Sequence, residues 1–260
     1  FDMLHGLHGW QWLFLLEGIP SVLLGVLTFW LLPNTYQQAK WLTPEEKQRI
    51  ADDLARDDAE ADHGKHSFRD GFFNLKVWML GGIDFAILLS AYAMGFWMPT
   101  FIKTAGVTDI TTIGYLTAIP SVAALLGMLL IGSSSDRLRE RRWHIIVPFI
   151  VGALAMAGST FFTHNALATV LLFSIAQAAI IGAVPVFFSL PATFLRGTAA
   201  ATGFALACSL ANIAGLVSNS LMGLALDLTG KSGGALWAFA GCLLLSSLLV
   251  VALPAKVVNR

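Results

Sequence analysis

Charged side chains are scarce in this sequence. They make up 12% of its 260 residues, about half the fraction usual in soluble domains. Acidic and basic residues are equal in number, so the formal net charge is zero and no overall positive field points to a nucleic-acid partner. Hydrophobic residues make up 56%. This composition excludes an ordinary soluble domain and is typical of an integral membrane protein.

Cysteine and catalytic motifs are equally rare. Cys208 and Cys242 lie inside apolar runs, without the Cys/Cys or Cys/His spacing of a metal site or a disulfide framework. Residues 230–234 match the letters GxSxG, but no strand–turn–helix context surrounds them, and no Walker A motif is present. We therefore expect no cofactor, no metal and no enzymatic activity.

Long apolar runs are abundant. A bilayer core of about 30 Å requires roughly 20 apolar residues in a helix, and a spanning strand would alternate polar and apolar residues. We predict an all-α polytopic membrane protein with seven transmembrane helices, at residues 10–32, 75–98, 112–132, 144–163, 166–190, 198–226 and 235–253. Small residues recur every four positions in the sixth run, which favours close helix packing.

The link between the first two runs, residues 33–74, is long and polar. Thr43, Pro44 and Glu46 fit the N-cap, first and third positions of a helix with a capping box. We expect a surface helix there, on the membrane face.

The positive charges are distributed unevenly over the connections. Fourteen of the sixteen cations fall in one alternating set of links and flanks, and only Lys103 and Lys231 fall in the other. Because Lys and Arg collect in cytoplasmic loops, this predicts an outside N-terminus and a cytoplasmic C-terminus. The short connection 133–142 contains four arginines and by itself supports this orientation.

That connection also carries a motif. Gly132, Asp136, Arg137 and Arg141 resemble the GxxxDRxGRR signature of the major facilitator superfamily, in which it clamps helix ends on the cytoplasmic side as the transporter changes state. Arg139 stands where the family has a second glycine, and Glu140 where it has an arginine. The substituted glycine calls the tight turn of this motif into question.

Further segments resemble the anion:cation symporter family of that superfamily: residues 9–26 and 31–50, 96–103 and 194–230. The resemblance implies the sixth to twelfth helices of a twelve-helix fold, with helices one to five absent from this sequence. Residues 1–32 would then be the last helix of the N-terminal bundle, 33–74 the central cytoplasmic loop, and 75–260 the C-terminal six-helix bundle.

The function implied by the resemblance is secondary active transport in a bacterial-type inner membrane. The expected substrate is a small organic anion, such as a sugar acid or an aromatic carboxylate, moved with H⁺ by alternating access. A non-transporting membrane sensor or scaffold of the same fold remains the alternative. The expected partners are this anion, H⁺ and the lipid bilayer, with no nucleic acid.

Ionisable residues are almost absent from the runs themselves. Glu17 and Asp84 are the two acids well inside them, and no Lys or Arg lies as deep. Charges at membrane depth usually face a protein interior or a water-filled cavity. Both acids remain open to two interpretations: a carboxylate in the substrate or proton pathway, or a structural acid hydrogen-bonded to a neighbour. By the resemblance, the main proton-coupling acids belong to the first half, which would make Asp84 auxiliary.

Uncharged polar residues supply the other cavity candidates. Asn212 and Asn219 are seven positions apart and share one side of a helix. In the resembled family this region faces the central cavity, so we expect Asn212 to contact substrate and Asn219 to lie farther out. Gln177, near the middle of its run, and Tyr92 are further candidates. Pro185 interrupts the fifth run, which favours either a static kink or a bend used in gating.

Overall fold

The computed structural model describes residues 6–60, 72–190 and 197–255, and the statements below concern these residues. The chain divides into two units, Phe1–Asp62 and His63–Arg260, and each is described by itself. Both consist of helices joined by short turns.

The first unit contains α1 (Gly9–Leu31), the short 3₁₀ helix η1 (Tyr36–Gln38) and α2 (Pro44–Glu60). α1 has 23 residues, none of them buried, and is long and apolar enough to cross a membrane. The predicted capping box of α2 is confirmed. The Glu46 carboxylate accepts from the Thr43 backbone N–H at 2.8 Å, and the Thr43 hydroxyl accepts from the Glu46 N–H at 3.3 Å.

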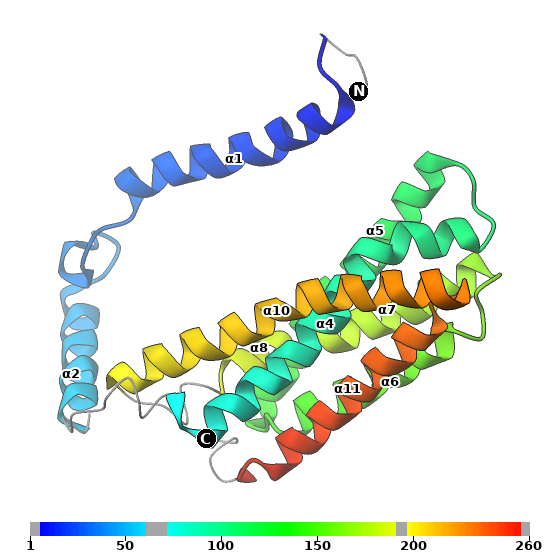
Figure 1. The fold of residues 1–260 in the computed structure, drawn as a ribbon. Coiled ribbons are helices and arrows are strands. Elements are labelled where there is room, and N and C mark those ends of the chain that lie inside the picture. The colour runs from blue at the N-terminus through cyan, green and yellow to red at the C-terminus, as the bar shows by residue number, and fades with distance from the viewer. Residues whose placement is uncertain (1–5, 61–71, 191–196, 256–260) are drawn as a thin grey trace. The chain divides into compact units, whose positions relative to one another are not determined.

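The second unit is a helical bundle (Figure 1). Its elements are α4 (Leu75–Thr104), α5 (Ile110–Leu138), α6 (Trp143–Ser159), α7 (Ala166–Gly182), α8 (Val184–Phe188), α10 (Gly197–Thr229) and α11 (Gly233–Ala252). Side chains of Asn74, Asp109 and Asn165 cap the starts of α4, α5 and α7 by accepting backbone N–H groups.

Six helices in the described part of the chain are long and apolar enough to span a membrane, one fewer than the sequence predicts. The exception is α6, which has 17 residues and ends at Ser159 instead of residue 163. Ser159 and Thr160 donate their hydroxyls to the carbonyls of Met156 and Ala157. These local bonds compete with helix continuation, and the chain turns directly into α7.

The fifth run is divided, as its proline predicts. α7 ends at Gly182, and α8 begins at Val184 with Pro185 in its first turn. Proline has no N–H to continue the helical ladder, but it is tolerated at a helix start. The end of this run beyond Leu190 lies outside the described residues.

Helices that run in the same direction pair closely. α4 lies along α10, with Gly81 near Ala207 and Tyr92 near Gly215, so residue numbers rise together on both helices. α5 lies along α7 in the same parallel sense, with Gly127 against Ala178. α6 packs against α7 and α11, and α11 also contacts α4. α4 is therefore shared by several helix pairs and is central to the bundle.

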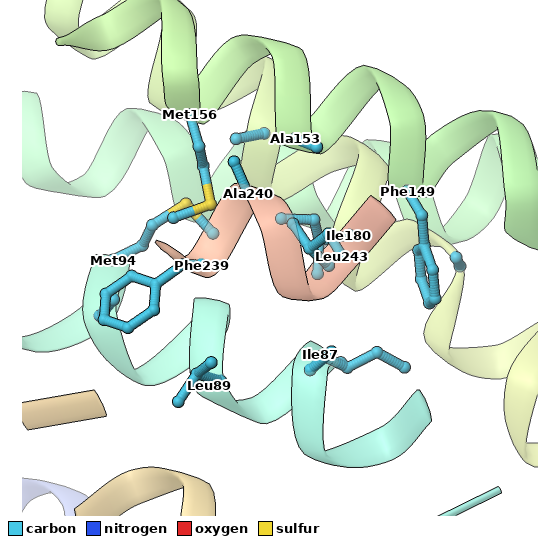
Figure 2. Close-up of a cluster of buried hydrophobic side chains, with 14 of the residues drawn as sticks. Ile87, Leu89, Met94, Phe149, Ala153, Met156, Ile180, Phe239, Ala240 and Leu243 are labelled. Atoms are coloured by element: carbon cyan, nitrogen blue, oxygen red, sulfur yellow. The ribbon is translucent and has the colours of Figure 1, made fainter. Parts of the chain in front are cut away.

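The core of this unit is apolar and tightly packed. Figure 2 shows Met94 of α4, Met156 of α6 and Phe239 of α11 meeting beside Ala153 and Ala240. Each of these side chains is at most 3% exposed. Large apolar side chains remain exposed along α5, including Leu125, Leu126, Leu129 and Leu130, as expected of a surface that faces lipid or other helices.

Candidate functional site

Asp84 is the buried acid of the bundle. It lies in the first half of α4, where only 3% of its surface is exposed, and no described residue donates a hydrogen bond to its carboxylate. The Cys208 thiol of α10 lies near enough for electrostatic interaction with that carboxylate. α10 approaches closely because Gly81 is small: a methyl group there would contact the Ala207 Cα at 3.4 Å. The structure thus places Asp84 at the α4–α10 interface.

Farther along the same pair of helices, two predicted residues lie at one polar–aromatic cluster. The ring of Tyr92 covers Gly215, where an added Cβ would stand 3.1 Å from the ring. The Trp97 indole N–H donates to the Asn219 side-chain oxygen at 3.1 Å. The Asn219 amide in turn donates to the Gly215 carbonyl at 3.0 Å. This cluster joins α4 to α10 through one hydrogen bond and one close ring contact.

Asn212 does not join this cluster. Its amide donates to the carbonyl of Cys208 one turn earlier at 2.8 Å, and its side chain is exposed on the described unit. The Asn212 side-chain oxygen is therefore available to a ligand or to another helix. The structure brings Tyr92 and Asn219 together and leaves Asn212 separate from them.

Gln177 borders a small cavity between α4, α5 and α7. The cavity measures about 60 Å³, and Met94, Met98, Thr117 and Phe173 form part of its wall. The Gln177 Oε1 atom is buried and has no hydrogen-bond partner among the described residues. Ser174, three residues earlier on α7, donates its hydroxyl to the Val170 carbonyl at 2.7 Å.

The GxxxDRxGRR-like segment is more helical than predicted. α5 continues to Leu138, so Gly132, Asp136 and Arg137 lie on its last turns, and the connection shortens to residues 139–142. The tight turn forms despite the substitution of its glycine. Arg139 adopts the left-handed conformation with φ of 51°, and Glu140 N–H bonds to Ser135 O at 3.1 Å. This arrangement is a Schellman motif.

A small hydrogen-bond network stiffens this turn, and sequence reasoning missed it. The Glu140 carboxylate accepts the Trp143 N–H at 2.9 Å, at the start of α6, and contacts His144 Nδ1 at 3.0 Å. His144 Nε2 lies 3.1 Å from the Ser134 hydroxyl. The spacing of these residues could have revealed the network. Glu140 precedes Trp143 by three positions and His144 by four, and an acidic side chain just before a helix often accepts the free N–H groups of its first turn.

Asp136 and Arg141 of the motif meet at a hollow of about 260 Å³, which Ser135 and Arg139 also line. Arg142 donates to the Val251 carbonyl near the end of α11. Gly132 is not part of this hollow, and a Cβ there would meet nothing within 4 Å. The structure therefore unites three charged side chains at one helix end and ties that end to α11.

Glu17 lies in the first unit, apart from these clusters. It is exposed on α1, and Ser21 donates its hydroxyl to the Glu17 carbonyl at 3.2 Å. The Thr28 hydroxyl likewise donates to the Leu24 carbonyl at 2.8 Å. The Ser21 and Thr28 hydroxyls are thus bonded within their own helix.

These features define a polytopic helical membrane protein with polar groups between its helices. The family model described as Major Facilitator Superfamily matches residues 3–219. The chain belongs to the major facilitator superfamily.

Relatives from three bacteria support this family membership. "Putative metabolite transport protein NicT" of Pseudomonas putida is 77% identical over 260 residues, which are 100% of this chain and 60% of the relative. A "Putative tartrate transporter" of Agrobacterium vitis is 34% identical over 96% of this chain and 55% of the relative. The "Quinolone resistance transporter" of Acinetobacter baumannii is 34% identical over 98% and 59%. The chain thus spans less than two thirds of the length of these relatives.

Proposed function

We propose that this protein is a secondary active transporter that moves a small organic anion across a bacterial inner membrane together with H⁺. Family membership and the printed names of the relatives, a metabolite transport protein and a tartrate transporter among them, support transport of an organic solute. We further propose that the solute is an anion and that it moves together with H⁺.

The observation that carries the proposal is the burial of Asp84 without a hydrogen bond from any described residue. Burying a carboxylate without a hydrogen bond costs several kcal/mol, and a replacement by leucine would remove that cost. A side chain this unfavourable for stability, in a membrane-length helix, is best explained by a role in moving protons or solute. Asp84 would take up and release the proton, while Glu17 is the second carboxylate at membrane depth.

A carboxylate substrate also requires a cationic partner. No Lys or Arg lies well inside the apolar runs of these 260 residues. We therefore propose that the anion-binding cation lies outside the spans present here. Efficient anion uptake by these 260 residues alone would contradict this proposal.

The proposed mechanism is alternating access, in which two helix bundles rock about a site near the middle of the membrane. Residues 1–32 would end the first bundle, 33–74 would be the central cytoplasmic loop, and 75–260 would form the second bundle. Asn212, Tyr92, Gln177 and Asn219 would contribute to the cavity. The C-terminus would be cytoplasmic, and Asp136, Arg137 and Arg141 would form a latch on that side.

The test is uptake by the intact protein in proteoliposomes. Vesicles with an acidic exterior should accumulate labelled tartrate or another small organic anion, and collapse of the pH gradient with a protonophore should abolish accumulation. Empty vesicles are the control. If no organic anion in a panel of sugar acids, dicarboxylates and aromatic carboxylates is accumulated under any gradient, the proposed transport function is wrong.

A further inference from the structure

We propose that the cavity beside Gln177 recognises a hydroxyl group, so that the substrate is a hydroxylated organic anion rather than a plain carboxylate. This inference rests on the proposed transport function and narrows its substrate class. The cavity would hold the hydroxyl-bearing end of the substrate, and Gln177 would determine the preference for hydroxylated over plain anions.

The first observation is the state of the Gln177 amide. Its Oε1 atom is buried, and no described residue forms a hydrogen bond with either end of the amide. A buried amide group without a hydrogen-bond partner is unfavourable, because it has given up its bonds to water and received nothing in return. Two hydroxyl groups also line the cavity. That of Thr117 donates to the Ile113 carbonyl at 2.7 Å and has no proton left for Gln177, and Ser121 lies exposed at the rim. The partner of this amide is therefore not among the described residues, and a bound ligand can supply it.

The second observation is the size of the cavity. Its volume of about 60 Å³ corresponds to roughly two water molecules at about 30 Å³ each. Pockets that hold a whole small-molecule ligand measure about 300–1,000 Å³. Only a small group at one end of a substrate fits. Gly95 and Ser121 at the rim are exposed, so such a group can enter from the surface of the bundle.

The third observation is the chemistry of the wall. Met94, Met98 and Phe173 present apolar surface, and no charged residue lines the cavity. A carboxylate would lose its hydration there without a cationic partner, which is costly. A hydroxyl is neutral, donates one hydrogen bond and accepts others. It can therefore satisfy the amide through the oxygen and the NH₂ alike, whichever way the amide faces.

Gln177 is also held firmly in place. α5 and α7 touch at the next residue, since a Cβ on Gly127 would lie only 2.1 Å from the Ala178 carbonyl oxygen. On the far side of the same contact, Gly182 lies against the Gly127 backbone, where its own Cβ would be 2.8 Å from the Gly127 carbonyl carbon. With this backbone contact α7 has little freedom to rotate, so the amide stays directed at the cavity. Such pre-organisation is what a specificity-determining group requires.

The experiment compares matched anions that differ only in hydroxyl groups: tartrate with succinate, and 4-hydroxybenzoate with benzoate. Uptake by the intact protein in proteoliposomes gives an apparent affinity for each. We expect the wild-type protein to prefer the hydroxylated member of a pair by roughly tenfold, the effect of one hydrogen bond to a buried group. Gln177→Met, which keeps the length of the side chain and removes the amide, should abolish this preference, so that both members of a pair are taken up with equal apparent affinity.

Ser174→Ala is the matched control, because Ser174 is one turn away on α7, is satisfied by its own helix and does not line the cavity. It should keep the preference. If Gln177→Met does not fold, as judged by size-exclusion chromatography, Thr117→Val removes a second polar group from the wall of the cavity and should weaken the preference as well.

The outcomes separate the two proposals. Equal uptake of both members of each pair by the wild-type protein, or a preference that survives in Gln177→Met, would overturn the hydroxyl site and leave organic-anion transport standing. A cavity that holds only water would produce this same result. No uptake of any of the four anions would overturn the hydroxyl inference and, with the wider panel described above, the transport proposal too.

Discussion

The indole of Trp97 donates a hydrogen bond to the side-chain oxygen of Asn219 at 3.1 Å, across the parallel helices α4 and α10. The contact connects two helices that are proposed to border the transport cavity.

The first prediction concerns this bond. Asn219→Ala and Trp97→Phe should each destabilise the protein, and a double-mutant cycle should give a coupling of about 0.6 kcal/mol, the average for hydrogen bonds between membrane helices. Thermal unfolding of the purified protein in detergent provides the measurement. Asn212→Ala is the control, since its amide bonds its own helix, and it should show no coupling to Trp97. A coupling energy of zero between Trp97 and Asn219 would show that the bond does not stabilise the protein.

The second prediction concerns the contact between α5 and α7. A Cβ at Gly127 would stand 2.1 Å from a backbone oxygen, which a side-chain rotation cannot relieve. Gly127→Ala should therefore lower the free energy of unfolding by about 1–3 kcal/mol or more. Gly241→Ala in α11 is the matched change, because nothing lies within 4 Å of that position. It should raise stability by up to about 1 kcal/mol, and equal effects of the two substitutions would contradict the packing.

The third prediction concerns the turn after α5. Arg139 has φ of 51°, a conformation that costs a non-glycine residue about 1–2 kcal/mol. Arg139→Gly should therefore increase the free energy of unfolding by about 1 kcal/mol. Arg137→Gly, two residues earlier and inside the helix, should decrease it by about as much. Unfolding curves for the two variants, measured side by side, should shift in opposite directions; a shared direction would argue against the left-handed turn.

The fourth prediction concerns Asp84. Asp84→Leu should abolish proton-driven uptake in proteoliposomes, while the unfolding temperature stays the same or rises, because the cost of an unpaired buried carboxylate disappears. Asp109→Asn is the control, since Asp109 caps α5 outside the span through Thr112, and uptake should persist. Retained proton-driven uptake in Asp84→Leu would show that Asp84 does not carry the proton, whereas the non-transporting sensor or scaffold predicts no uptake by the wild-type protein either.

The fifth prediction concerns the proposed cytoplasmic latch. Asp136→Ala should lower the maximal transport rate severalfold and change the half-saturation concentration much less, because the latch acts on the change of state and not on binding. Initial uptake rates over a range of substrate concentrations separate the two quantities. Ser133→Ala is the control, as the Ser133 hydroxyl donates to the Leu129 carbonyl of its own helix. An unchanged maximal rate in Asp136→Ala would remove the latch from the mechanism.

Much of the architecture was predictable because it depends on local composition. The apolar runs predicted the helices to within a few residues over most of their length, and Thr43 and Glu46 predicted the start of α2, since capping involves residues three positions apart. Helix ends were predicted less well. α5 runs six residues past residue 132, because polar residues continue a helix as readily as apolar ones once it leaves the membrane.

The candidate site was predictable only as a set of separate residues. The rarity of charge in the spans singled out Asp84 and Glu17, and position along the runs singled out Gln177, Tyr92 and Asn219. Their partners were not foreseeable. The Trp97–Asn219 bond, for example, joins two side chains that are separated by 122 positions along the chain.

By itself, the sequence determined that this chain forms apolar helices, where most of them begin, and which family motif it carries, because these properties depend on composition and on spacing within a few turns. The tertiary structure decided which helices pair, that no described residue donates a hydrogen bond to Asp84, and that Gln177 faces a cavity of about 60 Å³. Those properties depend on side-chain packing between helices far apart along the chain, where the absence of a single Cβ at Gly127 or Gly215 sets how closely two helices approach.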